Sequence, residues 1–396
     1  MRRAVITGMG LVSCLGNELE TFWSRLVAGE RGLSRITRFD TTGLRNDHGG
    51  VVRDFAFCPR EYGLREAPDE ATQFAVAASG SALADANLVV DEALAERAGL
   101  VFSTNFGGAL SWDGWLPDAT REGRLFREFD FRTAADHAAR ALGLRGPHAM
   151  LSLSCASGAA ALGRCLETIR AGRAEVMLAG GHDSLAPSPL AGLSILRTIT
   201  TDDIRPFDAK RSGTLFSEGA AVLVVEEFER ARARGARVYC ELRGAGQNNN
   251  AYHMTAPDPG GVGMVRVVRR ALADACLLPE EIGYINAHGT GTEHHDPAET
   301  EAIKTVFGDQ AYRLPISSSK GALGHMMAAA GTVEAIVTAL AIRDGVVPLT
   351  ANLHEPDPAC DLDYVPGESR QQAVACALSI SAGIGGSNAA VVLRAV

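Results

Sequence analysis

Short apolar runs alternate with helix-like segments along the whole chain, and this alternation constrains the fold more than any other feature. The runs at 98–103, 220–225 and 283–287 have the length of buried strands, and polar residues or glycines follow them. The segments 70–86 and 326–343 are long enough to form helices that cover a sheet. This order of elements predicts a layered α/β architecture.

The two halves of the chain carry similar orders of predicted elements. A chain of 396 residues is too long for one small core, so two domains or one duplicated domain is expected. No sequence repeat is visible, but a charged helix end near 232–240 leads into a new strand. We therefore predict two similar halves, 1–238 and 239–396.

The composition limits the function classes. The net charge of −9 gives no overall basic field, which argues against a nucleic-acid partner. No stretch approaches 18 uninterrupted apolar residues, so no membrane span is expected. The eight cysteines are scattered and form no C-x-x-C pair, which argues against a zinc ribbon and a disulfide framework. We expect a protein of the reducing cytoplasm.

The N-terminal segment resembles a signal peptide only in being apolar. Its apolar stretch is short and interrupted by glycines. We predict a first strand at 3–6 and a turn at 7–10.

Cys155 stands where an apolar run at 150–154 meets a helix of small residues at 156–170. The N-terminus of a helix offers backbone N–H groups and a positive dipole, which lower the pKa of a thiol and can hold an oxyanion. The alternative is a buried, unreactive cysteine, and we expect that outcome for the other seven cysteines.

Two histidines are flanked by glycines at comparable places. His288 ends the predicted strand 283–287, and His325 precedes the apolar helix 326–343. Either histidine alone could cap a turn or lie exposed at a helix start. Together with Cys155 they indicate a catalytic centre.

These segments resemble the β-ketoacyl synthase family, especially the elongating synthases of type II fatty-acid and polyketide systems. The resemblance extends over essentially the whole chain and implies a thiolase-like αβαβα fold of two duplicated halves. Its motifs lie at 3–10, 143–147, 152–158, 205–208, 218–220, 251–255, 288–292, 320–325 and 385–388.

The resemblance implies roles for individual residues. Cys155 would take an acyl group from a carrier thioester. His288 and His325 would then promote the loss of CO2 from a malonyl thioester and stabilise the enolate by hydrogen bonds. Lys320 and Glu334 match the family's supporting polar residues, and they could equally form a structural ion pair.

Further contacts are implied by the same resemblance. The oxyanion hole would use the backbone N–H groups of Cys155 and Ile384. Thr290 and Thr292 match the threonines that bind the phosphopantetheine arm.

The sequence departs from the family pattern at the acyl site. The usual Phe-Gly-Phe-Gly-Gly stretch is replaced by one with Ala382 and Ile384, which predicts a wider entrance without an aromatic gate. Phe106 falls where the family lines its acyl pocket, so its ring is expected to shorten that pocket, unless it only packs in the core. The stretch His294-His295-Asp296 stands where the family has a Gly-Asp stretch, and we expect the two histidines to be solvated loop residues rather than metal ligands.

The implied partners are an acyl carrier protein and a second ketosynthase-like chain, in a homodimer or a heterodimer. The segment 110–140 is shorter than in typical elongating synthases, so the pairing geometry is left open. The resemblance implies no metal and no redox cofactor, because phosphopantetheine comes with the carrier. Candidate docking residues, which could also be plain solvated surface, are Arg121, Arg124, Arg127, Lys210 and Arg211.

The predicted activity is a decarboxylative Claisen condensation, in fatty-acid or, in keeping with the departures, type II polyketide biosynthesis. Three alternatives are considered. Chain-length factors usually lack the active cysteine, and the paired histidines argue against an acyltransferase that does not decarboxylate. Thiolases typically carry a second cysteine near the C-terminal glycines, where this chain has Ile384.

Overall fold

The computed structural model describes residues 2–117 and 123–396. Within them, ten strands form one continuous sheet that divides into two sets of five. The first set consists of β1 (Ala4–Val12), β4 (Ala98–Ser103), β5 (His148–Leu151), β6 (Val176–Asp183) and β7 (Gly219–Glu227). The second set consists of β8 (Cys240–Asn249), β9 (Tyr284–Asn286), β10 (Ile316–Ser317), β13 (Cys376–Gly383) and β14 (Ser387–Arg394).

The two sets have the same topology. Their spatial orders are β5-β4-β6-β7-β1 and β10-β9-β13-β14-β8. In the first set β4 is parallel to β5 and β6, and β7 is antiparallel to β6 and β1. In the second set β9 is parallel to β10 and β13, and β14 is antiparallel to β13 and β8. The predicted α/β fold with duplicated halves is thereby confirmed, and the division at 238/239 stays a prediction.

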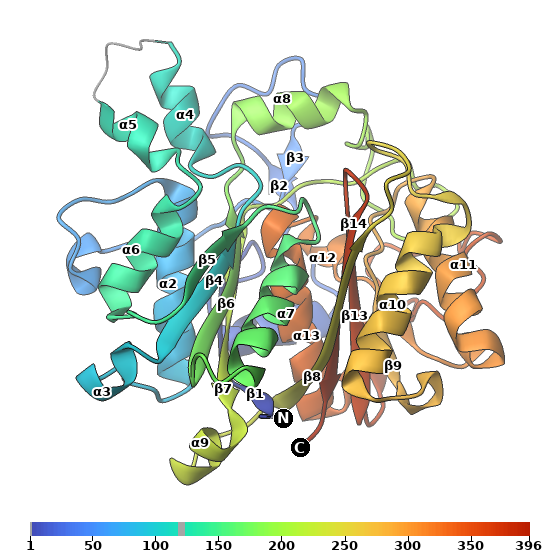
Figure 1. Cartoon of the computed structure of the whole chain (residues 1–396). Helices are drawn as coiled ribbons and strands as arrows, with labels where there is room; N and C mark the ends of the chain where they lie inside the picture. The colour runs from blue at the N-terminus through green and yellow to red at the C-terminus, as the bar shows by residue number, and fades with distance from the viewer. Residues whose placement is uncertain (1, 118–122) are drawn as a thin grey trace.

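Helices fill three layers around the two sets of strands (Figure 1). The helices α7 (Ser157–Arg170) and α13 (Ala330–Asp344) contact each other and contact strands of both sets. The helix α2 (Glu70–Asp85) covers β1 and β7, and α10 (Val262–Ala275) covers β8 and β14. The result is a five-layer αβαβα arrangement in which α7 and α13 form the central layer.

Shorter elements complete the chain. The remaining α-helices are α1 (Leu19–Val27), α3 (Glu92–Ala95), α4 (Ala109–Trp115), α5 (Gly123–Glu128), α6 (Thr133–Leu142), α8 (Pro187–Ile195), α9 (Phe228–Ala233), α11 (His295–Phe307) and α12 (Lys320–Leu323). The 3-10 helices are η1 (Pro59–Tyr62), η2 (Pro259–Gly261), η3 (Pro279–Glu281), η4 (Gly308–Tyr312) and η5 (Met327–Ala329). Two small two-stranded sheets pair β2 (Ser34–Arg35) with β3 (His48–Gly49), and β11 (Val346–Val347) with β12 (Arg370–Gln371).

The turn predicted at 7–10 is wrong, because β1 continues through it to Val12. Gly8 and Gly10 belong to the sheet, and they let α2 approach the strand closely. A Cβ on Gly8 would lie 2.2 Å from the carbonyl oxygen of Ala82, and a Cβ on Gly10 would lie 2.2 Å from that of Ala78. The glycines therefore serve helix–sheet packing rather than a reversal of the chain.

The helix predicted at 326–343 begins later than expected. A 3-10 turn, Met327–Ala329, precedes α13, which starts at Ala330. Every residue of α13 from Ala330 to Ala341 is buried, as expected of a helix between two sheets.

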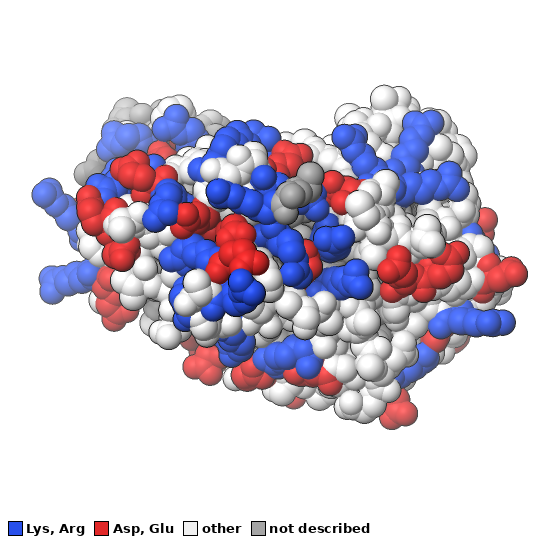
Figure 2. Space-filling model, turned by 60° about the horizontal axis from the view of Figure 1, so that its bottom comes forward, with Lys and Arg blue, Asp and Glu red and all other residues white. Residues whose placement is uncertain are grey.

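Charged side chains of both signs are intermingled on the face drawn in Figure 2. Acidic groups interrupt the basic ones there, in keeping with the net negative charge of the chain. None of the described helices has the length and apolar character needed to cross a membrane.

Candidate active site

Cys155 lies on a tight turn between β5 and α7. Ser154 has a φ of 54°, in the left-handed region that side chains rarely adopt. The hydroxyl of Ser157 donates to the carbonyl oxygen of Ser154 at 2.5 Å and accepts the N–H of Leu153 at 2.7 Å. These bonds fix the strained turn, so that Cys155 faces the interior where the two halves meet.

The C-terminal glycine-rich segment packs directly on this turn. A Cβ on Gly383 would lie 2.9 Å from the backbone nitrogen of Cys155, so only glycine permits the approach. The N–H of Ile384 interacts with the thiol of Cys155 and favours its thiolate. The N–H groups of both residues named for the oxyanion hole are thus close to the sulfur.

The direction of the pKa shift of the Cys155 thiol is opposite to the one expected from the sequence. Burial raises the pKa of Cys155, and the Ser154 hydroxyl, the charge of Lys320 and the Ile384 N–H only partly oppose this effect. The cost of placing a thiolate in a dry site therefore outweighs the groups that favour it. The pKa of Cys155 is therefore held above the ordinary value of a thiol.

His288 follows β9 and is held through its backbone by Glu299 of α11. The N–H of His288 donates to Oε1 of Glu299 at 2.7 Å, and the N–H of Gly289 donates to Oε2 at 2.8 Å. Burial raises the pKa of Glu299 to about 8, although both backbone bonds oppose the shift. Glu299 was not identified from the sequence, since a glutamate in a predicted helix carries no signal of this contact.

Lys320 and Glu334 form a buried ion pair behind His288. Their side chains are only 2% and 1% exposed, and Nζ of Lys320 contacts Oε1 of Glu334. The same Nζ donates to the carbonyl oxygen of His288 at 2.6 Å and lies 3.5 Å from its Nδ1. An ammonium group can only donate, so Nδ1 of His288 is the acceptor and Nε2 carries the proton.

His325 lies between α12 and η5, at the start of the segment that leads into α13. The N–H of Met327 donates to Nδ1 of His325 at 3.0 Å, which again leaves the proton on Nε2. That Nε2 is buried and has no hydrogen-bond partner among the described residues. A buried donor without a partner is costly, which is the usual mark of a group reserved for a ligand.

The two imidazoles are close to each other and uncharged. Their ring centres are 5.5 Å apart and their planes are nearly perpendicular, at 84°. Burial, followed by the charge of Lys320, lowers the pKa of both His288 and His325 well below 6.5. Two neutral Nε2–H donors therefore stand in one site, an arrangement suited to a developing oxyanion.

A cavity of about 490 Å³ joins these groups. Its wall includes Cys155 and both histidines, and it also includes four other residues named from the sequence: Thr290, Thr292, Ala382 and Ile384. Residues from both halves of the fold therefore contribute to one cavity.

Asp183 joins two segments of this site and was not identified from the sequence. It ends β6 and accepts hydrogen bonds from the hydroxyl of Thr104 at 2.7 Å and from the N–H of Phe106 at 3.0 Å. It also accepts the N–H of Ala328 at 2.9 Å. Burial raises the pKa of Asp183 to about 6.

Phe106 is not part of the cavity wall. It packs in an apolar cluster together with Ile384, Leu190, Leu193 and Met327.

The five candidate docking residues are in different situations. Arg124 pairs with Glu66, and Lys210 pairs with Glu355 at 2.5 Å. The side chain of Arg211 is only 7% exposed and holds Asp357, so it is not a free surface cation. Arg127 is exposed, and Arg121 lies outside the described residues.

The expectation that both His294 and His295 are solvated is wrong for His295. His294 is exposed, but the ring of His295 lies 4.9 Å from that of His288. His294 also lines the cavity, but only His295, the first residue of α11, makes a ring contact with His288 among the described residues. None of the described residues form a group of three or more suited to hold a metal ion.

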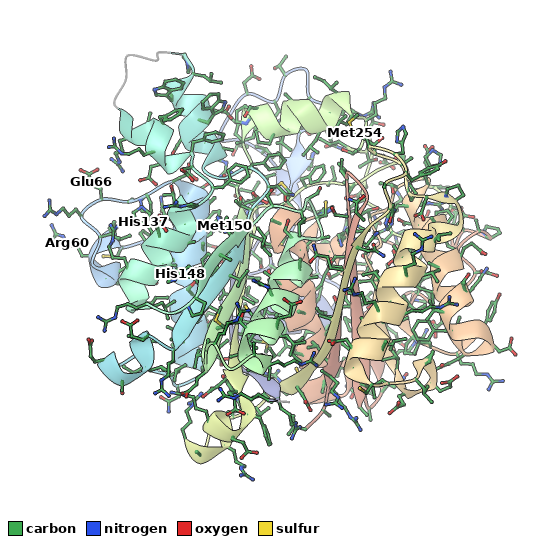
Figure 3. All side chains as sticks on the ribbon, in the orientation of Figure 1. Arg60, Glu66, His137, His148, Met150 and Met254 are labelled. Carbon is green, nitrogen blue, oxygen red and sulfur yellow. The ribbon has the colours of Figure 1, made fainter. Side chains whose placement is uncertain are left out.

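The cavity mouth carries two arginines that sequence reasoning missed. Arg45 and Arg197 line it, and neither has a carboxylate partner among the described residues. Nε of Arg45 donates to the carbonyl oxygen of Ile199 at 2.8 Å. Met254, labelled in Figure 3, is exposed and follows the end of β8 in the chain. Its carbonyl oxygen accepts the N–H of Gly385 at 2.7 Å.

A cysteine at a helix start, facing two neutral histidines between duplicated halves, defines a thiolase-like acyltransferase. The family comparison agrees with this class. The N-terminal domain model of the β-ketoacyl synthases matches residues 1–231, and the C-terminal domain model matches residues 239–354. The chain therefore belongs to the β-ketoacyl synthase family.

Individual relatives align along the whole chain. The 3-oxoacyl-[acyl-carrier-protein] synthase 2 of Coxiella burnetii is 39% identical over 412 aligned positions, which cover 100% of this chain and 99% of that protein. A ketosynthase structure, described as a type II polyketide acyl-carrier protein in complex with its ketosynthase bound to the hexaketide, superposes with a TM-score of 0.92 at 33% identity and full coverage of both chains. The ishigamide ketosynthase/chain length factor superposes with a TM-score of 0.93 at 35% identity, over 100% of this chain and 99% of that one.

Proposed function

We propose that this enzyme joins an acyl group held on Cys155 to a decarboxylated malonyl unit delivered by an acyl carrier protein. The observation that carries the proposal is the shared cavity in which Cys155 faces the neutral pair His288 and His325. Membership in the β-ketoacyl synthase family supports it further.

The first half of the proposed reaction loads the acyl group. The sulfur of Cys155 attacks the carbonyl carbon of the acyl carrier thioester. The new S–C bond replaces the bond to the carrier sulfur, and the proton of the Cys155 thiol passes to that sulfur. The N–H groups of Cys155 and Ile384 hold the oxyanion of the tetrahedral intermediate.

The second half uses the two histidines. The Nε2–H groups of His288 and His325 donate to the thioester oxygen of malonyl carrier. The bond between the α-carbon and the carboxylate breaks, CO2 leaves, and the electron pair forms the enolate that these donors stabilise. The enolate carbon attacks the acyl carbonyl on Cys155, and the sulfur leaves and regains a proton.

The phosphopantetheine arm of the carrier is proposed to enter past Thr290 and Thr292. Both line the cavity, and their hydroxyl oxygens lie 3.0 Å apart. Arg45 and Arg197 at the mouth are suited to hold the phosphate of the arm, because a guanidinium binds phosphate oxygens with charge-assisted bonds. No further cofactor takes part in the proposed reaction.

We propose a type II polyketide pathway in preference to fatty-acid synthesis. The replacement of the gate residues by Ala382 and Ile384 supports a specialised substrate, as does the type II polyketide ketosynthase among the structural relatives. Phe106 and Ile384 pack against the same apolar cluster, which is consistent with a short acyl pocket.

Pairing with a second chain is proposed along β5. This strand ends the ten-stranded sheet, and its residues are exposed or half-buried, whereas β10 at the other end is fully buried. His148 and Met150 mark this open edge in Figure 3. An unpaired edge is a natural place for another strand to add. Sedimentation of the chain alone, and with a co-expressed ketosynthase-like chain, distinguishes a homodimer from a heterodimer.

Two measurements test the proposed reaction. Intact-protein mass spectrometry after incubation with acyl carriers is expected to find an adduct on the wild type and none on Cys155→Ala. Labelled malonyl carrier is expected to release CO2 together with a β-ketoacyl product. Product without CO2 would indicate an acyltransferase that does not decarboxylate, and absence of both adduct and CO2 would indicate a non-catalytic partner chain.

A further inference from the structure

The cavity wall contains two further histidines that the proposed reaction does not use, and one of them, His295, contacts His288. The ring centre of His295 lies 4.9 Å from that of His288, and the planes meet at 68°. His295 is the first residue of α11, lines the same cavity as Cys155, and has a side chain that is only 16% exposed. Its contact with His288 is the closest ring contact of either proposed catalytic histidine.

His288 is enclosed between two rings. The ring centre of His288 lies 5.5 Å from that of His325 and 4.9 Å from that of His295. Lys320 occupies the Nδ1 side of His288 at 3.5 Å. An imidazole ring has only one soft torsion once its χ1 is fixed, and edge-to-face neighbours restrict that torsion.

The polar atoms of His295 do not explain its burial. Its Nδ1 is buried without a hydrogen-bond partner, and it lies 3.8 Å from Oε2 of Glu299, which is too long for a hydrogen bond. Both oxygens of Glu299 already accept backbone N–H groups of His288 and Gly289. The ring contact with His288 is therefore the closest interaction that the structure shows for His295 on this side, because Nδ1 makes no hydrogen bond.

We infer that His295 is a positioning residue for the proposed decarboxylation, in which its ring keeps Nε2 of His288 aimed at the malonyl thioester oxygen. The inference rests on the proposed function and adds a third histidine to it.

Removal of the ring has a predictable electrostatic consequence. His295 helps to keep water and charge away from His288, whose lowered pKa is caused first by burial, then by Lys320 and His295. Water that enters the space left by the ring would raise the pKa of His288 towards its ordinary value. The groups that face His288 from the surrounding elements are Lys320, Glu334, His325, His295, Glu299 and Cys155.

Three variants separate the ring from its nitrogens. His295→Ala removes the ring, His295→Phe keeps a ring without nitrogens, and His295→Asn keeps a polar group without a ring. We expect kcat for CO2 release to fall about tenfold in His295→Ala and His295→Asn, because small misplacements of a catalytic group have effects of this order. We expect Phe to stay within about twofold of the wild type, and the KM for malonyl carrier to be unchanged in all three.

The pH profile supplies a second readout. In His295→Ala the acid limb of kcat is expected to move to higher pH, whereas a purely structural loss of folded enzyme would scale the whole profile. The matched control is His48→Ala, since His48 is an exposed histidine that is not part of the cavity wall.

The results divide cleanly. If kcat fell as far in His295→Phe as in His295→Ala, a nitrogen of His295 would touch the substrate, and the positioning role would be overturned. A rise in KM at constant kcat would have the same meaning. Unchanged kcat in Ala would remove any role. Acylation of Cys155 is expected to persist in all variants, so its absence from the wild type itself would count against the proposed function and not against His295.

Discussion

Gly158 of α7 and Gly331 of α13 lie where the two central helices approach most tightly. A Cβ on Gly331 would stand 2.3 Å from the backbone nitrogen of Ala159, and a Cβ on Gly158 would stand 2.8 Å from that of Thr332. Cys155 lies just before α7 and His325 just before α13. The crossing of the two glycines therefore sets how closely the cysteine of one half approaches the histidine of the other.

Gly331→Ala is expected to force the central helices apart. Overpacking of a tight core costs about 1–3 kcal/mol, and displacement of His325 from Cys155 should lower condensation by at least about tenfold. Chemical denaturation and CO2 release measure the two effects. Gly192→Ala is a suitable control, because a Cβ there would meet no atom within 4 Å. Normal activity in Gly331→Ala would mean that the helix spacing does not govern the site.

The Lys320–Glu334 pair is expected to behave as a unit. Glu334→Gln leaves the charge of Lys320 buried without its partner, which should cost about 3–5 kcal/mol of unfolding free energy. The double variant Lys320→Met, Glu334→Leu should recover much of that stability, yet remain inactive because His288 loses its Nδ1 donor. Urea unfolding with parallel assays tests this. Additive losses in the double variant would contradict a coupled pair.

The two half-reactions are expected to differ in pH dependence. Burial raises the pKa of Cys155 above its ordinary value of 9.0, so alkylation of this thiol should still be accelerating at pH 9, as the thiolate fraction grows. His288 and His325 are already neutral well below pH 6.5, so decarboxylation should have no acid limb between about pH 6 and 8. Peptide-resolved mass spectrometry follows Cys155 separately from exposed Cys58 and Cys276. A plateau of alkylation at neutral pH would contradict the raised pKa.

The phosphate contact proposed for Arg45 and Arg197 is open to a direct comparison. Malonyl thioesters of phosphopantetheine and of pantetheine differ only in the phosphate. The wild type should prefer the phosphorylated form by about tenfold in kcat/KM, since a charge-assisted hydrogen bond contributes on that order. Arg45→Gln with Arg197→Gln should abolish the preference and leave turnover of the pantetheine thioester unchanged. A preference that survives the double change would assign the phosphate to other groups.

Phe106 is expected to limit the acyl chain. Its ring packs against the same apolar cluster as Ile384, a residue of the cavity wall, so Phe106→Gly should let this cluster yield and shift loading of Cys155 towards longer acyl chains. Competition among acyl carriers of different chain length, read by intact mass, measures the shift. An unchanged preference would indicate that Phe106 only packs in the core. Phe102, buried in β4, offers a control for the general loss of an aromatic ring.

Much of the fold was accessible from local patterns. Strand-length apolar runs and helix-length segments predicted the alternation, and the limits of β4 agree with the predicted run at 98–103. The motifs around Cys155, His288 and His325 identified the three residues that the tertiary structure brings into one cavity. Local patterns suffice there because the end of a strand and the start of a helix are set mainly by residues close together in the sequence.

Other features depended on contacts between distant segments. The sequence predicted a turn at Gly8 and Gly10, and only the packing of α2 on β1 explains why they lie within a strand. The sequence predicted that His295 is a loop residue, and only the position of α11 beside His288 makes it part of the site. The same holds for Glu299, Asp183, Arg45 and Arg197, whose partners are remote in the sequence or belong to the cavity mouth.

The sequence by itself therefore determined the layered α/β class, the family and the three proposed reacting residues, because these follow from residue type and local spacing. Tertiary structure decided the direction of the pKa shift of Cys155, the tautomers of the histidines and the inclusion of His295 in the site. Those properties arise from burial and from hydrogen bonds between segments far apart in the chain, and such effects exist only once the two halves have closed around the cavity.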